Sequence, residues 1–105
     1  MNHFSPQPKA GKCVSKPLRD FAKGQDCAMR GPYCNNNPET VVLCHTRMAG
    51  FNGINCKPLD FLGYHGCFEC HRHELEMGYD DIYRAVAETQ TRVFQAGLIT
   101  VKGSK

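Results

Sequence analysis

The clearest pattern of hydrophobic and polar positions lies in the last third of the chain. Asp80 or Asp81 can cap a helix there, and Gly97 stands where a helix commonly ends in a left-handed residue. Between these ends, apolar residues recur at helical spacing: Ile82, Tyr83, Val86, Val93 and Phe94. We predict a long amphipathic helix whose core side chains include Tyr79, Tyr83, Val93 and Phe94.

Shorter elements are predicted earlier in the chain. Residues 17–23 can form a short helix, because Pro17 is tolerated at the first helical position and Gly24 can end the helix. Residues 40–44 are few and mostly β-branched, which predicts a strand. Alternation along this strand places His45 on the opposite face from Cys44.

Two further segments follow a loop that is rich in glycine and asparagine. Residues 58–62 can begin a short turn or a strand. After Cys67 the composition becomes helical, and we predict a helix through Glu76 that ends before Gly78. The chain thus combines short helices, a strand and a long C-terminal helix, which is typical of a small α+β domain.

The N-terminal residues differ from the rest in composition. Residues 1–16 contain prolines among polar residues and no apolar period, which predicts a flexible basic arm. A domain would then occupy residues 17–102, with a tail at 103–105. Residues 1–30 carry six basic and two acidic side chains, a local excess that suits either contact with phosphates or a solvated tail.

The chain has 105 residues, 7 cysteines and a net charge of +3. So small a core gains much from a metal staple. No apolar run is long enough for a signal peptide or a membrane span, so we expect a cytoplasmic location. In a reducing compartment, paired cysteines bind metal more often than each other.

Two cysteine pairs have the spacing of zinc ligands. Cys67 and Cys70 are three residues apart, and Cys27 and Cys34 flank a Gly-Pro turn. Together they offer four sulfurs to one structural Zn²⁺. Buried free thiols are the plain alternative, Cys56 is a rival ligand, and His71 could replace one of the cysteines on the zinc.

Two histidines lie beside these pairs, His45 at the end of the predicted strand and His71 directly after Cys70. A strand, a loop and a metal-held helix with this placement is the layout of a ββα-metal site. There His45 can take a proton from water, and His71 can hold a divalent cation against a phosphate. The alternative for His45 is a histidine satisfied inside the fold.

The chain also resembles a known family in several motifs. These are the two cysteine pairs, Asn37-Pro38-Glu39-Thr40-Val41-Val42-Leu43-Cys44-His45, Lys57-Pro58-Leu59-Asp60 and Cys67-Phe68-Glu69-Cys70-His71. They are similar to the YbcO-like nucleases of phages and prophages, within the HNH (ββα-metal, His-Me finger) endonuclease superfamily. The resemblance covers residues 18–98 and is most specific at residues 37–45 and at the second cysteine pair.

The resemblance implies a role for each site residue. Cys27, Cys34, Cys67 and Cys70 would be structural zinc ligands, His45 the general base and His71 a ligand of a catalytic Mg²⁺ or Mn²⁺. The middle residue of the HNH site would be Asn55 or Asp60. Asp60 fits the family pattern better, and it could orient His45 or bind the cation. The substrate would be DNA in a bacterial host cell.

One departure from the family concerns Cys44, which stands where related enzymes often have an acidic cation ligand. A thiol is a poor ligand for Mg²⁺, which prefers oxygen. Cys44 therefore favours the alternative function, a non-catalytic zinc module of a phage or prophage that binds DNA or a protein. A structural or inhibitory phage protein built on the same scaffold is a third reading.

Charged and aromatic residues near the site have two readings each. Arg47, Lys57 and Arg72 could contact phosphates or could be solubilising charge. His65 and His73 are expected on the surface first, and as phosphate contacts second. A homodimer would suit an enzyme that cuts both strands, but no residue requires one.

Overall fold

The structure, a computed structural model, describes residues 11–46 and 58–105. Within them the chain forms a two-stranded sheet and helices, so the predicted α+β class is confirmed. In chain order the elements are α1 (Lys16–Ala22), η1 (Pro38–Thr40), β1 (Val42–His45), η2 (Asp60–Leu62), β2 (Gly63–Gly66), α2 (Phe68–Arg72), η3 (Glu74–Glu76) and α3 (Tyr79–Gln95).

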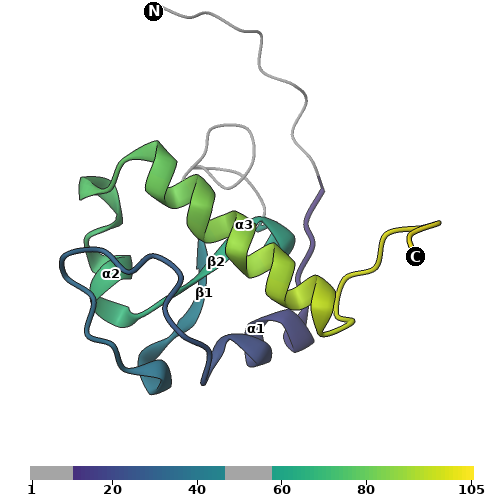
Figure 1. The fold of residues 1–105 in the computed structure, drawn as a ribbon, viewed down its shortest axis with the longest axis horizontal. Helices are drawn as coiled ribbons and strands as arrows, with labels where there is room; N and C mark the ends of the chain where they lie inside the picture. Colours follow the sequence, from purple (N-terminus) through teal and green to yellow (C-terminus); the bar gives the residue numbers. More distant parts are fainter. Residues whose placement is uncertain (1–10, 47–57) are drawn as a thin grey trace, which may run out of the picture.

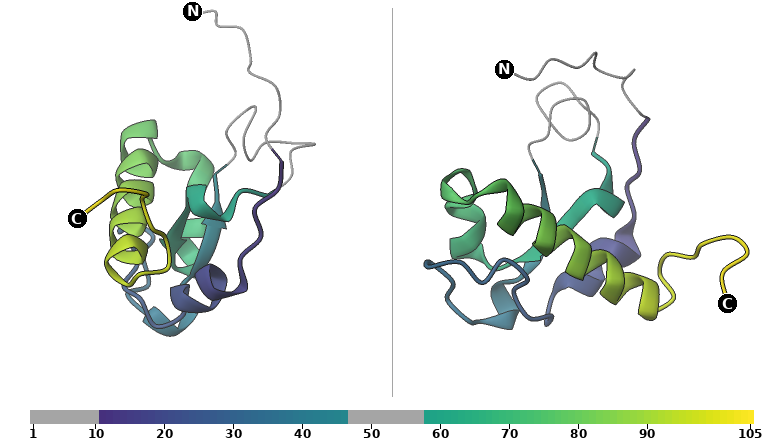
Figure 2. Two further views of the ribbon diagram at one scale, coloured as in Figure 1. Left: turned by 90° about the vertical axis from the view of Figure 1, so that its right-hand side faces the viewer. Right: turned by 45° about the horizontal axis from the view of Figure 1, so that its top comes forward.

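The centre of the fold is an antiparallel hairpin covered by the C-terminal helix. In the ladder of β1 and β2, Val42 lies opposite Gly66 and His45 opposite Gly63. Figures 1 and 2 show α3 lying across one face of this hairpin, while α2 follows β2 at the hairpin end away from His45. The hairpin therefore sets two separate ends, one beside His45 and one beside the second cysteine pair.

The hydrophobic core lies between the hairpin and α3, and it also contains the first cysteine loop. Its buried members include Met29, Val41, Cys44, Tyr64 and Ala85. Cys44 points into this core, on the opposite strand face from His45 as alternation predicts. In the part of the chain that the structure describes, no helix is long and apolar enough to span a membrane.

The long C-terminal helix was predicted correctly, and its buried face was predicted in part, since Ile82 and Val86 pack against the core. Val93 is buried as expected, whereas Tyr79 is 91% exposed, Tyr83 76% and Phe94 44%. The helix turns its smaller residues Ala85 and Thr89 toward the hairpin. Small side chains let a helix approach a sheet closely. Close packing of Ala85 and Thr89 therefore decided which face is buried, rather than the larger apolar surface of the tyrosines.

Thr89 escaped prediction because threonine reads as polar. Its hydroxyl is nevertheless fully satisfied in the core: it accepts a hydrogen bond from the backbone N–H of His65 at 2.8 Å and donates to the carbonyl of Ala85 at 2.8 Å. A buried hydroxyl with both bonds costs little. Thr89 thus fixes α3 to the centre of β2.

The second strand was not predicted. Its sequence, Gly-Tyr-His-Gly, is short and bounded by glycines, which weaken strand propensity. Close approach explains Gly63, because a Cβ there would lie 2.9 Å from the carbonyl oxygen of Cys44 on the paired strand. Gly63 thus lowers the strand propensity of this segment in the sequence, yet its missing side chain is what allows β2 to pair with β1.

The helix ends agree with the sequence in part. The predicted cap of the long helix at Asp80 or Asp81 is wrong, because α3 begins at Tyr79 after Gly78 and both acids lie within its first turn, where they favour the positive end of the helix dipole. Ser15 caps α1 by accepting a hydrogen bond from the N–H of Leu18 at 3.2 Å, and Gly97 has the expected positive φ of 78° after α3. The helix predicted up to Glu76 ends at Arg72 instead. The chain then turns inward, because Glu74 is buried and accepts a hydrogen bond from the hydroxyl of Tyr64.

Contacts of the domain begin before residue 17, within the segment predicted as a flexible arm. Cys13 forms a parallel β-bridge with Leu59. The Cys13 N–H donates to the Pro58 carbonyl at 2.8 Å, and the Cys13 carbonyl accepts a hydrogen bond from the Asp60 N–H at 2.8 Å. Residues 1–10, the greater part of the predicted arm, lie outside the described residues. The described residues 13–15 run along the segment that carries Asp60.

Candidate functional site

The four cysteines predicted as zinc ligands lie together. The sulfurs of Cys27, Cys34, Cys67 and Cys70 are all within 4.8 Å of one another, and the Cys34 and Cys67 sulfurs are 3.9 Å apart. Four sulfurs around a tetrahedral Zn²⁺ are separated by about 3.8 Å, given Zn–S bonds of about 2.3 Å. The cluster can therefore hold a metal such as zinc. His71 is not a member of it, and Cys56 lies outside the described residues.

Backbone N–H groups point at the cysteine sulfurs, as expected of thiolates that bind metal. The Cys67 N–H approaches the Cys27 sulfur at 3.3 Å, and the Cys70 N–H approaches the Cys67 sulfur at 3.4 Å. Burial raises the pKa of the Cys67 thiol, but the N–H groups of Asn35 and Cys70 outweigh it and lower this pKa to about 7. The Cys67 sulfur is thus suited to a negative charge, whereas burial raises the pKa of the Cys34 and Cys70 thiols.

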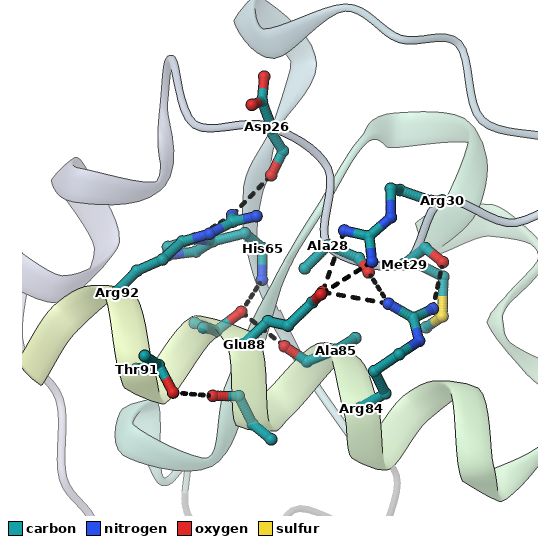
Figure 3. A network of polar contacts seen from close by, with 12 residues as sticks. Asp26, Ala28, Met29, Arg30, His65, Arg84, Ala85, Glu88, Thr91 and Arg92 are labelled. Carbon is teal, nitrogen blue, oxygen red and sulfur yellow. Dashed lines mark hydrogen bonds and ion pairs between the residues drawn. The ribbon is translucent and has the colours of Figure 1, made fainter.

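Helix α3 fixes the loop that carries the first cysteine pair. The guanidinium of Arg84 donates to the carbonyls of Ala28 and Met29 at 2.8 and 2.9 Å, and that of Arg92 donates to the Asp26 carbonyl at 2.7 Å (Figure 3). These bonds hold the chain on both sides of Cys27. The second pair needs no such help, because it follows β2 directly and opens α2.

At the other end of the hairpin, His45 and Asp60 form a hydrogen-bonded pair. The Nε2 atom of His45 lies 2.7 Å from Oδ1 of Asp60. The His45 side chain is 30% exposed, whereas the Asp60 carboxylate is fully buried. β1 supplies the histidine and η2 the carboxylate, so the residues that sequence reasoning placed near one another do meet.

The carboxylate of Asp60 is held by three further donors. Arg19 reaches it with Nε at 2.8 Å and Nη2 at 3.0 Å, and the Ser15 N–H donates at 2.7 Å. Burial opposes ionisation, but the hydrogen bonds from Arg19, His45 and Ser15 prevail and lower the pKa of Asp60 to about 2. Asp60 is therefore ionised at neutral pH. With both oxygens engaged, it is suited to orient His45 and poorly placed to bind a cation.

The protonation of neutral His45 follows from this ionisation. A carboxylate can only accept a hydrogen bond, so Nε2 of His45 carries the proton in the bond to Asp60. The lone pair then resides on Nδ1. Among the described residues no partner of Nδ1 is found, and a partly exposed imidazole with this tautomer can take up a proton there.

The Asp60 pair gives a prediction about acid stability. Because the pKa of Asp60 is lower in the folded chain, about 2 against 3.8, the carboxylate contributes roughly 2 kcal/mol above about pH 5 and loses this contribution as the pH falls toward 2. In urea unfolding with excess zinc, Asp60→Asn should be less stable than the parent by about that amount at pH 7. The difference should shrink below about pH 4.

The comparison is made over the pH range in which both chains keep their zinc, because loss of the metal would remove the cooperative transition itself. Asp26→Asn is the matched control, since the Asp26 side chain is exposed and only its carbonyl accepts a bond. Equal stability of Asp60→Asn and the parent at pH 7 would contradict the ionised, clamped carboxylate.

The remaining predicted site residues are not gathered at His45. His71 is exposed in the last turn of α2, and no side-chain partner for it is found in residues 11–46 and 58–105. Along the ladder, three residue steps of about 3.3 Å separate the end beside His45 from the end that leads into α2. Arg72 is engaged on its own helix, with Glu69 at 3.5 Å and over the Phe68 ring.

Three residues named from the sequence, Arg47, Asn55 and Lys57, lie outside the described residues. Cys44 does not face His45: it is fully buried on the opposite face of β1, where burial raises its pKa to about 12. The position expected to bind a cation therefore belongs to the core. The thiol at position 44 is therefore no evidence against a catalytic role of His45.

The expectation that His65 lies on the surface is wrong. Its side chain is fully buried, with Nδ1 3.1 Å from Arg92 and the ring against Phe21, and burial and Arg92 lower its pKa to about 4. The residue lies on β2, the strand that the sequence did not reveal. His73 is partly exposed and stacks on Tyr33 with ring centroids 3.6 Å apart.

Sequence reasoning missed Arg19 and Ser15 as neighbours of the site. Arg19 lies 41 residues from Asp60 along the chain, in a helix whose other basic side chains are solvated. No local motif could have indicated the contact.

Comparison with known proteins places most of the chain in one group. The sequence model of the family described as "Putative nuclease YbcO" matches residues 16–96. Relatives of that description from Escherichia coli (strain K12) and Enterobacteria phage 82 are each 36% identical over 91 residues, covering 78% of this chain and 95% of theirs. The solved "Structure of a putative bacteriophage protein from Escherichia coli str. K-12 substr. MG1655" has a TM-score of 0.61 and 30% identity, covering 77% of this chain and 100% of its own.

Proposed function

Because the chain belongs to the family described as "Putative nuclease YbcO", we propose that it is a metal-dependent endonuclease of the HNH (ββα-metal) type. It would hydrolyse phosphodiester bonds in DNA. The observation that carries the proposal is the pair of His45 and Asp60. Nε2 of the partly exposed histidine meets a buried carboxylate, and Nδ1 has no partner within residues 11–46 and 58–105.

In the proposed reaction His45 is the general base. Its Nδ1 takes a proton from water as the water oxygen attacks phosphorus, and the bond from phosphorus to the leaving oxygen breaks. Asp60 keeps the proton of Nε2 in place and stabilises the positive imidazolium that forms, as the carboxylate does in a Ser-His-Asp triad. A divalent cation such as Mg²⁺ or Mn²⁺, when bound, supplies charge stabilisation at the phosphate.

Zinc is proposed at the four cysteines as a structural ion. The sulfur separations and the N–H groups aimed at them suit Zn²⁺. Since this cluster lies beyond the hairpin end opposite His45, its role is to join the first cysteine loop to α2. It would take no part in the chemistry.

His71 is the proposed protein ligand of the catalytic cation. Because α2 follows the hairpin end away from His45, the bound DNA backbone would have to reach from His45 to α2. It is exposed, and within the described residues its imidazole has no side-chain partner. Asp60 does not fit as a second ligand, because its oxygens already accept bonds from Arg19, Ser15 and His45. One imidazole binds a cation weakly, so the remaining ligands would come from phosphate and water.

DNA as the substrate is supported by the charge on α1. The first turn of the helix and the residues before it carry the exposed side chains of Lys12 and Lys16, and α1 packs against β1, whose last residue is His45. Basic side chains beside a cleavage site bind phosphates without reading sequence. Arg47, Lys57 and Arg72 stay proposed as further phosphate contacts.

The proposal is tested by counting zinc and measuring plasmid nicking on one preparation. Native mass spectrometry should find one zinc per chain, and nicking should require added Mg²⁺ or Mn²⁺. A zinc-loaded, folded protein that cleaves no form of DNA or RNA with Mg²⁺, Mn²⁺, Ni²⁺ or Zn²⁺ would overturn the nuclease and leave a zinc module that binds DNA or protein.

The role of His71 has its own prediction. His71→Ala should raise the cation concentration needed for half-maximal nicking by at least about 10-fold, because it removes the protein ligand. Zinc content and the melting temperature should stay at the parent values, since His71 is exposed and outside the cysteine cluster. An unchanged cation requirement would move the cation site away from α2.

A further inference from the structure

We propose that Arg19 is a positioning residue that acts through Asp60 on His45. This inference rests on the proposed function, because it assigns Arg19 a part in setting up the base. It concerns a residue on α1, which lies outside the hairpin that carries the base.

The contact between Arg19 and Asp60 is a two-point contact. Nε meets Oδ2 at 2.8 Å and Nη2 meets Oδ1 at 3.0 Å, while His45 also meets Oδ1, at 2.7 Å. A planar guanidinium that holds both oxygens fixes the carboxylate plane as well as its position. The oxygen that accepts from His45 is thereby fixed too.

The backbone before α1 completes the clamp. The Ser15 N–H donates to Oδ2 at 2.7 Å, and the Cys13 carbonyl accepts from the Asp60 N–H at 2.8 Å. Residues 13–19 thus hold Asp60 by main chain and side chain together. Cys13 and Ser15 lie before the range matched by the family model, which begins at residue 16.

The other basic side chains of α1 make no comparable contact. Lys16 pairs with Asp20 and is 84% exposed, and Lys23 pairs with Glu39 at 3.8 Å and is 71% exposed. Arg19 is 43% exposed and reaches a carboxylate with no exposed area. Arg19 therefore differs from a solubilising surface charge. Two of its N–H groups bind the buried carboxylate of Asp60, which in turn holds the proposed base His45.

The consequence for His45 is a single orientation and a single tautomer. With its carboxylate fixed, the ring N–H on Nε2 stays bonded and Nδ1 stays free. Without Arg19 the carboxylate keeps His45 on Oδ1 and the Ser15 N–H on Oδ2, but it loses the two-point contact that fixes its plane. The ring proton would then exchange with water more readily.

NMR spectroscopy of the zinc-loaded chain tests this without any cleavage. In protein with ¹⁵N-labelled histidine, the Nε2 proton of His45, assigned by its loss in His45→Gln, should be protected in the parent. In Arg19→Gln its exchange should be about 10-fold faster, the factor expected for a weakened charged hydrogen bond. Arg19→Lys, which keeps the charge but not the two-point contact, should fall between them.

Kinetics separate positioning from binding of the phosphate. Arg19→Gln should lower kcat by about 10-fold and leave KM near the parent value. Lys23→Gln, which removes the same charge from the same helix without touching Asp60, should leave kcat unchanged. Equal zinc content and circular dichroism confirm that each variant is folded.

Two results would overturn the inference: exchange of the His45 proton unaffected by Arg19→Gln, or a loss confined to KM and equal to that of Lys23→Gln. If the parent cleaves nothing, the proposed function fails. The exchange measurement then still decides whether Arg19 positions His45.

Discussion

Replacing His45 by glutamine should lower the rate of DNA cleavage by about 10²- to 10⁴-fold, the usual contribution of a general base. Glutamine is close in size to histidine and can still donate to Asp60, but it cannot take a proton from water. The measurement is nicking of supercoiled plasmid under single-turnover conditions, with Mg²⁺ or Mn²⁺ in excess. Zinc content and the melting temperature should match the parent, since the side chain is 30% exposed and lies outside the core.

The matched control for this variant is His73→Gln. His73 is 27% exposed, close to His45, yet it lies after α2 and stacks on Tyr33. It should keep parental cleavage. Equal cleavage by His45→Gln and the parent would remove His45 as the base, and an equal loss in both variants would point to an effect on folding.

Replacing Cys34 by serine should remove the zinc and abolish the cooperative unfolding transition. Structural zinc contributes about 10–16 kcal/mol in small domains, as much as or more than the whole net stability of 5–15 kcal/mol typical of proteins. Serine is nearly isosteric with cysteine, and Cys34 is only half-buried, so little packing is lost. Native mass spectrometry should report no zinc, and circular dichroism should show a broad, non-cooperative melt. A chelator should do the same to the parent.

Cys13→Ser is the control that separates metal binding from the loss of a thiol. Cys13 is half-buried like Cys34, but it is not in the cluster of four sulfurs. This variant should keep one zinc and the parental transition. A Cys34→Ser chain with one zinc and an unchanged midpoint would show that the cluster is not the staple of the fold.

The two sites differ in how far the sequence could predict them. Short spacings bring the two members of each cysteine pair together, which made a four-sulfur zinc site one expectation among several. Only the fold brings residues 27–34 to residues 67–70. His45 and Asp60 were candidates through their motif, but the partner of each was open. The sequence left two roles open for Asp60, orienting the base and binding the cation. The hydrogen bonds to His45 and from Arg19 occupy both carboxylate oxygens, so the structure favours orientation of the base.

Cys44 has one meaning in the sequence and another in the fold. In the sequence it occupies a position expected to carry an acid, which favours a non-catalytic protein. In the structure it lies in the core beside Tyr64, away from the face that carries His45. Strand alternation already separated the two faces, and the packing of α3 decided which face became the core.

By itself the sequence determined the features that depend on neighbouring residues: the short helix between Pro17 and Gly24, the end of α3 at Gly97 and the close spacing of Cys67 and Cys70. Local backbone preference and short chain closure are enough for these. Only the tertiary structure decided that Tyr79 and Tyr83 face solvent, that Gly63–Gly66 is a strand and that Arg19 holds Asp60. Each of these depends on a partner far along the chain, and the free energy of such a contact exists only once the fold has brought the two segments together.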